Sequence, residues 1–100
     1  MSLRNKIKSA MKEAMKEKAQ LRLSTLRLIS AAIKDRDIAA RSEGVEDGVD
    51  DTEILAILGK MTRQRQESAK TYEEAGRLDL SEREISEIQV IEYFLPRQLN

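Results

Sequence analysis

The sequence predicts an all-α domain of four helices, two helix pairs packed around one hydrophobic core. Charged residues make up 36% of the chain and aromatic residues only 3%, a composition typical of helical proteins. Strand formers are scarce, with three valines, two tyrosines, one phenylalanine and no tryptophan. Apolar residues recur at helical spacing in four segments separated by turn or loop signals. A length of 100 residues allows one domain with a single modest core.

The first predicted helix covers residues 3–18 and is amphipathic and basic. Its apolar residues lie at helical spacing, and Lys8, Lys12 and Lys16 recur every four residues on another face. Such a helix can lie on a membrane or on nucleic acid, but most helices of this kind pack on a domain and leave one face in solvent. We therefore expect a packed surface helix.

The second predicted helix covers residues 21–41 and is the most apolar of the four. Apolar residues occupy well over half of its circumference, which predicts a central helix buried by its neighbours. Arg27, Lys34 and Arg41 form a charged strip, since they are seven residues apart. A continuous helix through residues 18–20 would be longer than ordinary globular helices, so we expect a turn there.

Residues 43–50 contain two glycines and four acidic residues and predict a loop. The third helix then begins at Asp50 or Asp51, because Glu53 completes a capping box with Asp50. It ends at residue 75, where Gly76 suits the left-handed position after a helix.

Ser81 and Glu84 form a second capping box and predict the start of the fourth helix. Pro96 ends this helix, and residues 97–100 are expected to be a connector. Its buried stripe is predicted to comprise Ile85, Ile88, Ile91 and Leu95, with Val90 and Phe94 widening it. The aromatic residues Tyr72, Tyr93 and Phe94 are all expected in the core. The centre of the core is predicted to be Leu26, Ile29, Ile33, Leu58, Met61, Ile88 and Ile91.

The chain has no cysteine and no histidine, which excludes disulfides, thiolate or imidazole metal sites, and Cys- or Ser–His-dependent catalysis. No stretch approaches the roughly 18 apolar residues of a membrane span, and lysines interrupt the N-terminus too often for a signal peptide. We therefore expect a cytoplasmic protein with no membrane partner.

The net charge is zero, but the charge is unevenly distributed. Residues 1–41 carry eleven Lys/Arg and four Asp/Glu, whereas residues 42–100 carry seven and fourteen. Such asymmetry suggests an anionic partner for the basic half, or two halves that neutralise each other in the folded domain. The sequence leaves these two interpretations open.

Four short segments occur in order through the whole chain with no large insertion: residues 22–27 (RLSTLR), 63–68 (RQRQES), 76–80 (GRLDL) and 93–99 (YFLPRQL). Together they resemble the YqeY family, which is related to the tail of the GatB subunit of the tRNA-dependent amidotransferase. The resemblance implies a helical N-terminal domain, here residues 1–100, followed by a smaller helical domain similar to the GatB tail. Because the chain stops at Asn100, we expect that second domain to be absent.

The resemblance implies an accessory module that binds tRNA or an amidotransferase-like protein. One alternative is a protein-interaction or dimerisation domain, whose oligomeric state the sequence does not give. Another is a subunit with glutamine-dependent carbon–nitrogen ligase activity only in a complex. The residues themselves predict no catalytic group and no cofactor, because Lys8–Ser9 and Ser68–Lys70 lie within helices that neither expose nor activate a serine.

Two candidate ligand sites remain. Asp47, Asp50, Asp51 and Glu53 could gather a hard cation, but helix capping explains the aspartates and the spacing does not match a calcium loop, so we expect no metal.

The stronger candidate is a basic patch in which the strip of helix two meets cations of helix three and contacts phosphates. Its predicted nucleic-acid-binding residues are Arg27, Lys34, Lys60, Arg63, Gln64 and Arg65. The alternative is that Arg63 and Arg65 pair with Glu67, Glu73 or Glu84 inside the fold.

Overall fold

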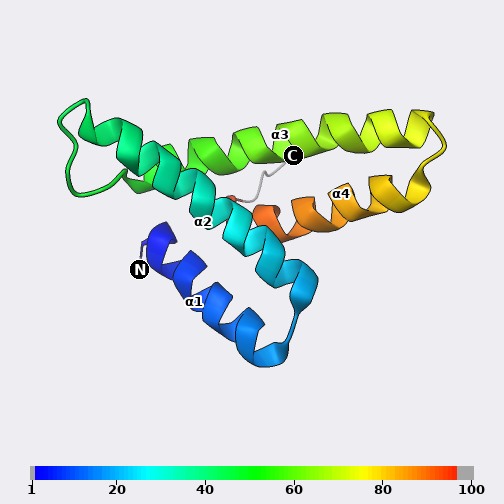
Figure 1. Ribbon diagram of the computed structural model, residues 1–100, viewed down its shortest axis with the longest axis horizontal. Helices are drawn as coiled ribbons and strands as arrows, with labels where there is room; N and C mark the ends of the chain where they lie inside the picture. The colour runs from blue at the N-terminus through cyan, green and yellow to red at the C-terminus, as the bar shows by residue number, and fades with distance from the viewer. Residues whose placement is uncertain (1, 97–100) are drawn as a thin grey trace.

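The computed structural model describes residues 2–96, so the predicted connector at residues 97–100 lies outside the described residues. It has four helices: α1 (Leu3–Glu17), α2 (Gln20–Arg41), α3 (Asp51–Glu74) and α4 (Leu78–Glu92). α1 pairs with α2 and α3 pairs with α4, and α2 touches all three other helices (Figure 1). The far end of the α3–α4 hairpin extends away from the α1–α2 pair (Figure 1). The all-α prediction is confirmed.

One hydrophobic core joins the two pairs. The seven residues predicted at its centre are all buried, and Ile7, Ile54 and Phe94 extend it to α1, to the start of α3 and to the end of α4. Burial of such side chains contributes about 1.5–3 kcal/mol each, which makes this cluster the main source of stability. None of the described helices is long and apolar enough to cross a membrane.

The turn between α1 and α2 lies where the sequence predicts it. Lys18 adopts a left-handed conformation with φ of 56°, and its backbone N–H and that of Ala19 donate to the last carbonyls of α1. This closes α1 without a glycine, although the Cβ atom of Lys18 is sterically strained in the left-handed conformation. The end of α3 is also as predicted, because Gly76 has a φ of 75° and the Arg77 N–H donates to the Tyr72 carbonyl.

The start of α4 differs from the prediction. The helix begins at Leu78, so Ser81 lies inside its first turn and does not cap it. The chain enters α4 directly after the left-handed Gly76, which leaves the Ser81 hydroxyl free to reach across to α3. There it donates to the Ala69 carbonyl at 2.9 Å in a buried position, so that a residue predicted as a cap instead connects two helices.

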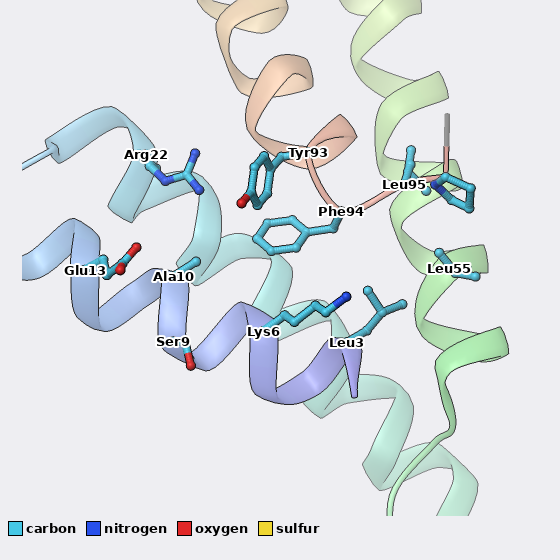
Figure 2. Close-up of a pocket in the computed structure, with 11 residues that line it drawn as sticks. Leu3, Lys6, Ser9, Ala10, Glu13, Arg22, Leu55, Tyr93, Phe94 and Leu95 are labelled. Atoms are coloured by element: carbon cyan, nitrogen blue, oxygen red, sulfur yellow. The ribbon is translucent and has the colours of Figure 1, made fainter. Parts of the chain in front are cut away.

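Several apolar residues predicted to be buried are exposed. On α2, Leu21, Leu28 and Ile38 are exposed, so the helix is not buried all round. On α4, Ile85 is exposed because the hairpin ends project beyond the other pair, and Tyr93 is 71% exposed. Phe94 is buried as predicted, where the chain after α4 packs back toward α1 (Figure 2).

Candidate functional site

The basic half of the chain is scarcely neutralised by the acidic half. Of the eleven Lys and Arg residues of residues 1–41, Arg4 and Arg36 alone make ion pairs within residues 2–96. Arg4 pairs within the same half, with Asp37. Arg36 is thus the only cation of residues 2–41 whose ion pairs, with Glu43 and Glu53 at 3.5 Å, reach the acidic half. The surplus positive charge of α1 and α2 therefore remains at the surface.

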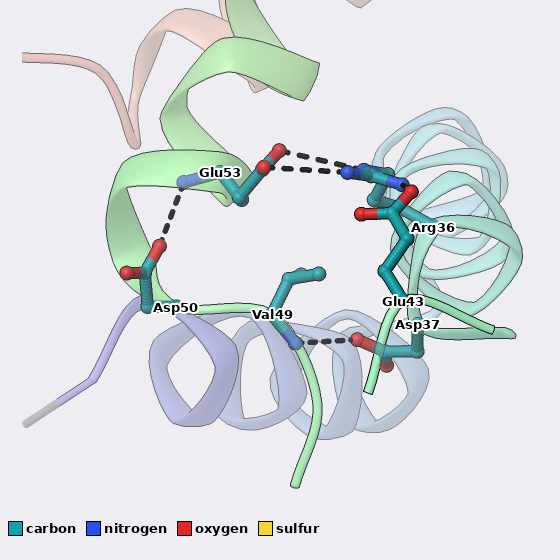
Figure 3. A network of polar contacts seen from close by, with 6 residues as sticks. All are labelled: Arg36, Asp37, Glu43, Val49, Asp50 and Glu53. Carbon is teal, nitrogen blue, oxygen red and sulfur yellow. Dashed lines mark hydrogen bonds and ion pairs between the residues drawn. The ribbon is translucent and has the colours of Figure 1, made fainter. Parts of the chain in front are cut away.

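The Arg4–Asp37 pair fixes α1, α2 and the following loop to one another. Arg4 donates two hydrogen bonds to the Asp37 carboxylate, at 2.8 and 3.0 Å, and a third to the Val49 carbonyl at 3.0 Å. The Val49 N–H donates to Asp37 at 2.8 Å (Figure 3). The Arg4 hydrogen bonds are the largest cause that lowers the pKa of Asp37 below its ordinary value, with the Val49 N–H adding to it. This pair has a structural role.

Arg36 joins the end of α2 to the start of α3. Its guanidinium donates to Glu53 and Glu43 at 3.5 Å, and the pKa of Arg36 is raised first by Glu53 and then by Glu43 (Figure 3). Asp50 caps α3 by accepting from the Glu53 N–H at 3.0 Å, as predicted. Within residues 2–96, no three His, Cys, Asp or Glu side chains gather closely enough to hold a metal ion. Asp50 thus serves as a cap, and Glu43 and Glu53 form ion pairs.

The predicted phosphate-binding residues are distributed over several surfaces. Arg27, Lys34, Lys60 and Arg63 are exposed, and none of them makes an ion pair in the described part of the chain. Lys34 lines a hollow between α1 and α2, whereas Arg63 lines another between α3 and the end of α4. Gln64 lies in a third hollow, on the outer side of α3. None of these three hollows contains cations of both predicted strips.

Arg65 is the exception among the predicted site residues. Its guanidinium donates to the Glu87 carboxylate of α4 at 3.0 Å and to the Met61 carbonyl at 3.3 Å. The two charged side chains are only 15% and 12% exposed. The predicted pairing partners Glu67, Glu73 and Glu84 do not take part in this contact, but the idea that Arg65 pairs inside the fold holds.

The lysine row of α1 continues onto α2. Lys8 and Lys34 line the same hollow, and the Ser30 hydroxyl lies 3.0 Å from the Met11 sulfur one turn further along. The two helices thus run antiparallel, which places Arg27 toward the end of α1 that carries the rest of the row. We call the exposed cations of this surface the α1–α2 basic face, comprising Lys8, Lys12, Lys16, Arg27 and Lys34.

The sequence analysis placed Tyr93 in the core and did not identify it as an exposed aromatic residue beside a hollow. The hollow lies between α1, α2 and the end of α4 and includes Tyr93 and Arg22 (Figure 2). A signal was present, because Ile88, Ile91 and Phe94 recur every three residues and leave Tyr93 off the buried stripe.

Comparison with known proteins places the chain among relatives of similar sequence. The family model described as "Yqey-like protein" matches residues 4–100. "Altered inheritance of mitochondria protein 41, mitochondrial" is 33% identical over 89% of this chain in Lachancea thermotolerans and 30% identical over 94% in Clavispora lusitaniae. An uncharacterized protein of Schizosaccharomyces pombe is 30% identical over 94% of this chain and is matched over 69% of its own length.

This chain spans about half the length of the first two relatives, 46% and 52%. The expected cytoplasmic location is wrong by this comparison, because the relatives from Lachancea thermotolerans, Clavispora lusitaniae and Kluyveromyces lactis are named as mitochondrial proteins. The expectation of no signal peptide and no membrane span did not separate the cytoplasm from the interior of an organelle. The match over nearly the whole chain shows that the protein belongs to the YqeY-like family.

Proposed function

We propose that this helical domain is a non-catalytic accessory module that binds tRNA through the phosphate backbone. The observation that supports the proposal most is the surplus positive charge of α1 and α2, which pairs with the acidic half through Arg36 alone in residues 2–96. A protein that places Lys and Arg against phosphates releases condensed counterions, and this supplies sequence-independent affinity for RNA.

The α1–α2 basic face offers the geometry for such contacts. Lys8, Lys12 and Lys16 stand one turn apart along α1, about 6 Å at 1.5 Å per residue, and Lys34 stands across the groove from Lys8. Because the helices hold the cations in two neighbouring rows, they can follow a backbone rather than a single phosphate. Contacts of this kind fix position and orientation but carry no base sequence.

Lys60 and Arg63 form a second, smaller group on α3. They lie one turn apart and are exposed, but Arg63 lines a hollow that also contains Glu92, which has no ion pair within residues 2–96. Asp37, in the hollow of Lys8 and Lys34, is by contrast paired with Arg4. The Glu92 carboxylate weakens the attraction for phosphate. We therefore assign the main contact to the α1–α2 basic face and a minor one to this group.

The chemistry of the chain favours binding over catalysis. It has neither cysteine nor histidine to serve as nucleophile or general base. The hydroxyls of Ser24 and Ser81 donate to backbone carbonyls within or between helices, which is a structural use. The carbon–nitrogen ligase activity that the family resemblance suggested would therefore need groups from another protein.

A protein partner, such as an amidotransferase-like enzyme or a second copy, is the second candidate. Leu21, Leu28 and Ile38 are exposed apolar residues on α2, and Leu28 is 47% exposed. Light scattering over a range of concentrations would detect self-association as a rise in mass. A constant monomer mass would exclude a second copy as the partner.

Binding of a fluorescent tRNA to three matched double variants tests the proposal. Arg27→Ala with Lys34→Ala removes two charges from the α1–α2 basic face, Lys60→Ala with Arg63→Ala removes two from α3, and Lys70→Ala with Arg83→Ala removes two from the acidic hairpin. The first variant is expected to lose the most affinity, and the third is expected to bind as the unchanged chain does. Equal losses in all three, or no binding of tRNA by the unchanged chain, would contradict the proposal.

A further inference from the structure

Tyr93 is an exposed aromatic residue held in a fixed orientation. Its ring packs edge-to-face against the buried Phe94, with centroids 5.1 Å apart and an interplanar angle of 87°. The guanidinium carbon of Arg22 lies 5.2 Å from the Tyr93 ring centroid. An aromatic ring that is 71% exposed yet held between these neighbours is preordered for contact with another molecule.

The ring borders a hollow of about 670 Å³ between α1, α2, α3 and the end of α4. Lys6 of α1 and Arg22 of α2 lie on opposite sides of the aromatic pair (Figure 2). Neither cation makes an ion pair within the part of the chain that the structure describes. Glu13 is the one carboxylate among the lining residues, so the charge of the hollow is positive. Leu3, Leu55 and Leu95 supply its apolar side (Figure 2).

We propose that this hollow binds an unpaired nucleotide of RNA, with the base stacked on Tyr93 and the neighbouring phosphates held by Arg22 and Lys6. The inference rests on the proposed function and deepens it, because it names the RNA element that the domain recognises. Bases inside a duplex have both faces covered by their neighbours, so an exposed aromatic ring selects for an unpaired base. The hollow lies within the range of about 300–1,000 Å³ that small ligands occupy in proteins.

Charge and shape together favour this ligand over a protein segment. Two cations flank an aromatic face, a combination that single-stranded nucleic acid sites use repeatedly. A tRNA carries paired stems as well as an unpaired end, so one molecule could contact the α1–α2 basic face and this hollow together. Stacking does not depend on the identity of the base, because every base has a π face, and recognition here would remain sequence-tolerant.

The first test compares a labelled RNA single strand of about six nucleotides with a blunt RNA hairpin whose two strands are joined by a non-nucleotide linker, so that it has no unpaired base, using three forms of the chain. Tyr93→Leu is expected to weaken single-strand binding at least about fivefold, which corresponds to loss of one stacking contact. Tyr93→Phe keeps the ring and is expected to bind within about twofold of the unchanged chain. Binding of the hairpin should not change in either variant, because it relies on phosphate contacts. Circular dichroism verifies that each variant is folded.

A second readout observes the ring directly. The chain has no tryptophan and only two tyrosines, so Tyr72→Phe leaves Tyr93 as the sole tyrosine fluorophore. Stacking of a base on the ring is expected to quench its fluorescence on addition of the single strand, and the hairpin should leave it unchanged. Glu13→Gln should tighten single-strand binding by up to about fivefold, because it removes the carboxylate from the hollow.

The outcomes separate this inference from the proposed function. If the chain binds RNA but Tyr93→Leu binds the single strand as tightly and no quenching occurs, the inference is wrong and the proposed function stands. If the chain binds neither RNA, both fail, and the hollow is better assigned to a protein segment.

Discussion

The two helix pairs use their charged residues differently. In the α3–α4 pair, Arg65 and Glu87 form a largely buried ion pair across the interface, and Arg77 pairs with Asp79 at the turn. In the α1–α2 pair, Arg4 and Asp37 form one structural pair, while nine other cations make no ion pair in residues 2–96. The α3–α4 helix pair thus uses a largely buried ion pair within its own structure, whereas the α1–α2 helix pair leaves most of its positive charge available for a partner.

Arg63 and Arg65 show the same contrast within one helix turn. Arg65 lies over the α4 interface and binds a carboxylate and a carbonyl, while Arg63 is exposed and lines a hollow between α3 and the end of α4. Their position relative to the neighbouring helix decides the difference, since both residues occur in the same RQRQES segment. A motif of charged residues on a helix therefore combines structural and surface positions, and only the packing separates them.

The largest expected effect comes from breaking the Arg65–Glu87 pair. Glu87→Gln should destabilise the domain by about 2–3 kcal/mol, because it leaves a largely buried guanidinium without its counter-charge. Arg63→Ala is the matched control and should change the free energy of unfolding by less than about 0.5 kcal/mol. Urea denaturation measures both values. Equal effects in the two variants would remove the distinction between the structural and the surface arginine.

Replacing both charges sharpens the same point. Arg65→Met with Glu87→Leu should recover most of the stability that Glu87→Gln loses, because apolar side chains of similar volume avoid the desolvation of charge. A double variant as unstable as the single one would indicate that the pair is needed for specific geometry rather than for compensation of charge.

The next effect concerns the structural pair of the basic half. Asp37→Asn should destabilise by about 1–2 kcal/mol at pH 7, because Asp37 accepts charge-assisted hydrogen bonds from Arg4 and a hydrogen bond from Val49. The folded state lowers the pKa of Asp37, so its contribution is complete above the unfolded value of about 3.9 and is lost as the pH falls through the folded value. The difference between the two proteins should therefore shrink below about pH 4.

Thermal or urea unfolding as a function of pH measures this difference. Asp35→Asn is the control, since Asp35 is exposed and makes no ion pair within residues 2–96. A difference for Asp37→Asn that remains constant from pH 7 to pH 3 would contradict the ionic role assigned to this residue.

The smallest effect lies at the connection between α1 and α2. Lys18 is in the left-handed region with φ of 56°, which disfavours residues that have a Cβ atom. Lys18→Gly should stabilise the domain by about 0.5–1 kcal/mol through relief of this strain. The greater conformational entropy of glycine in the unfolded chain offsets part of that gain. Lys16→Gly, within the last turn of α1, should destabilise by a similar amount. A destabilised Lys18→Gly variant would mean that the lysine side chain contributes more than its backbone strain.

Most of the fold could be predicted from the sequence because the helix signals are local. The turn at residues 18–20, the Asp50 cap, the left-handed Gly76 and the seven core residues follow from helix length, capping and spacing. Ser81 was misassigned because a residue of capping type can equally serve a contact between helices, and only the packing of α4 on α3 decides. Ile85 and Leu28 were misassigned because apolar periodicity does not show which positions of a helix its neighbours cover.

The candidate site was less predictable, since it depends on which helix faces meet. The sequence identified Arg27 and Lys34 as one strip, but it could not show that Lys8 lies across a groove from Lys34. It also could not show that Arg65 reaches Glu87 on α4. Tyr93 was expected in the core together with Phe94, but only Phe94 is buried, because the spacing of Ile88, Ile91 and Phe94 leaves Tyr93 off the buried stripe.

The most direct test of the open basic face is the salt dependence of tRNA binding. The logarithm of the binding constant should fall linearly with the logarithm of salt concentration, and each phosphate contact contributes about 0.7–0.9 to the slope. Arg27→Ala with Lys34→Ala should reduce the slope by up to about 1.4–1.8, which is about 0.7–0.9 for each lost contact, while Lys70→Ala with Arg83→Ala should leave it unchanged. A slope that is the same for both variants and the unchanged chain would show that the α1–α2 basic face does not contact the RNA.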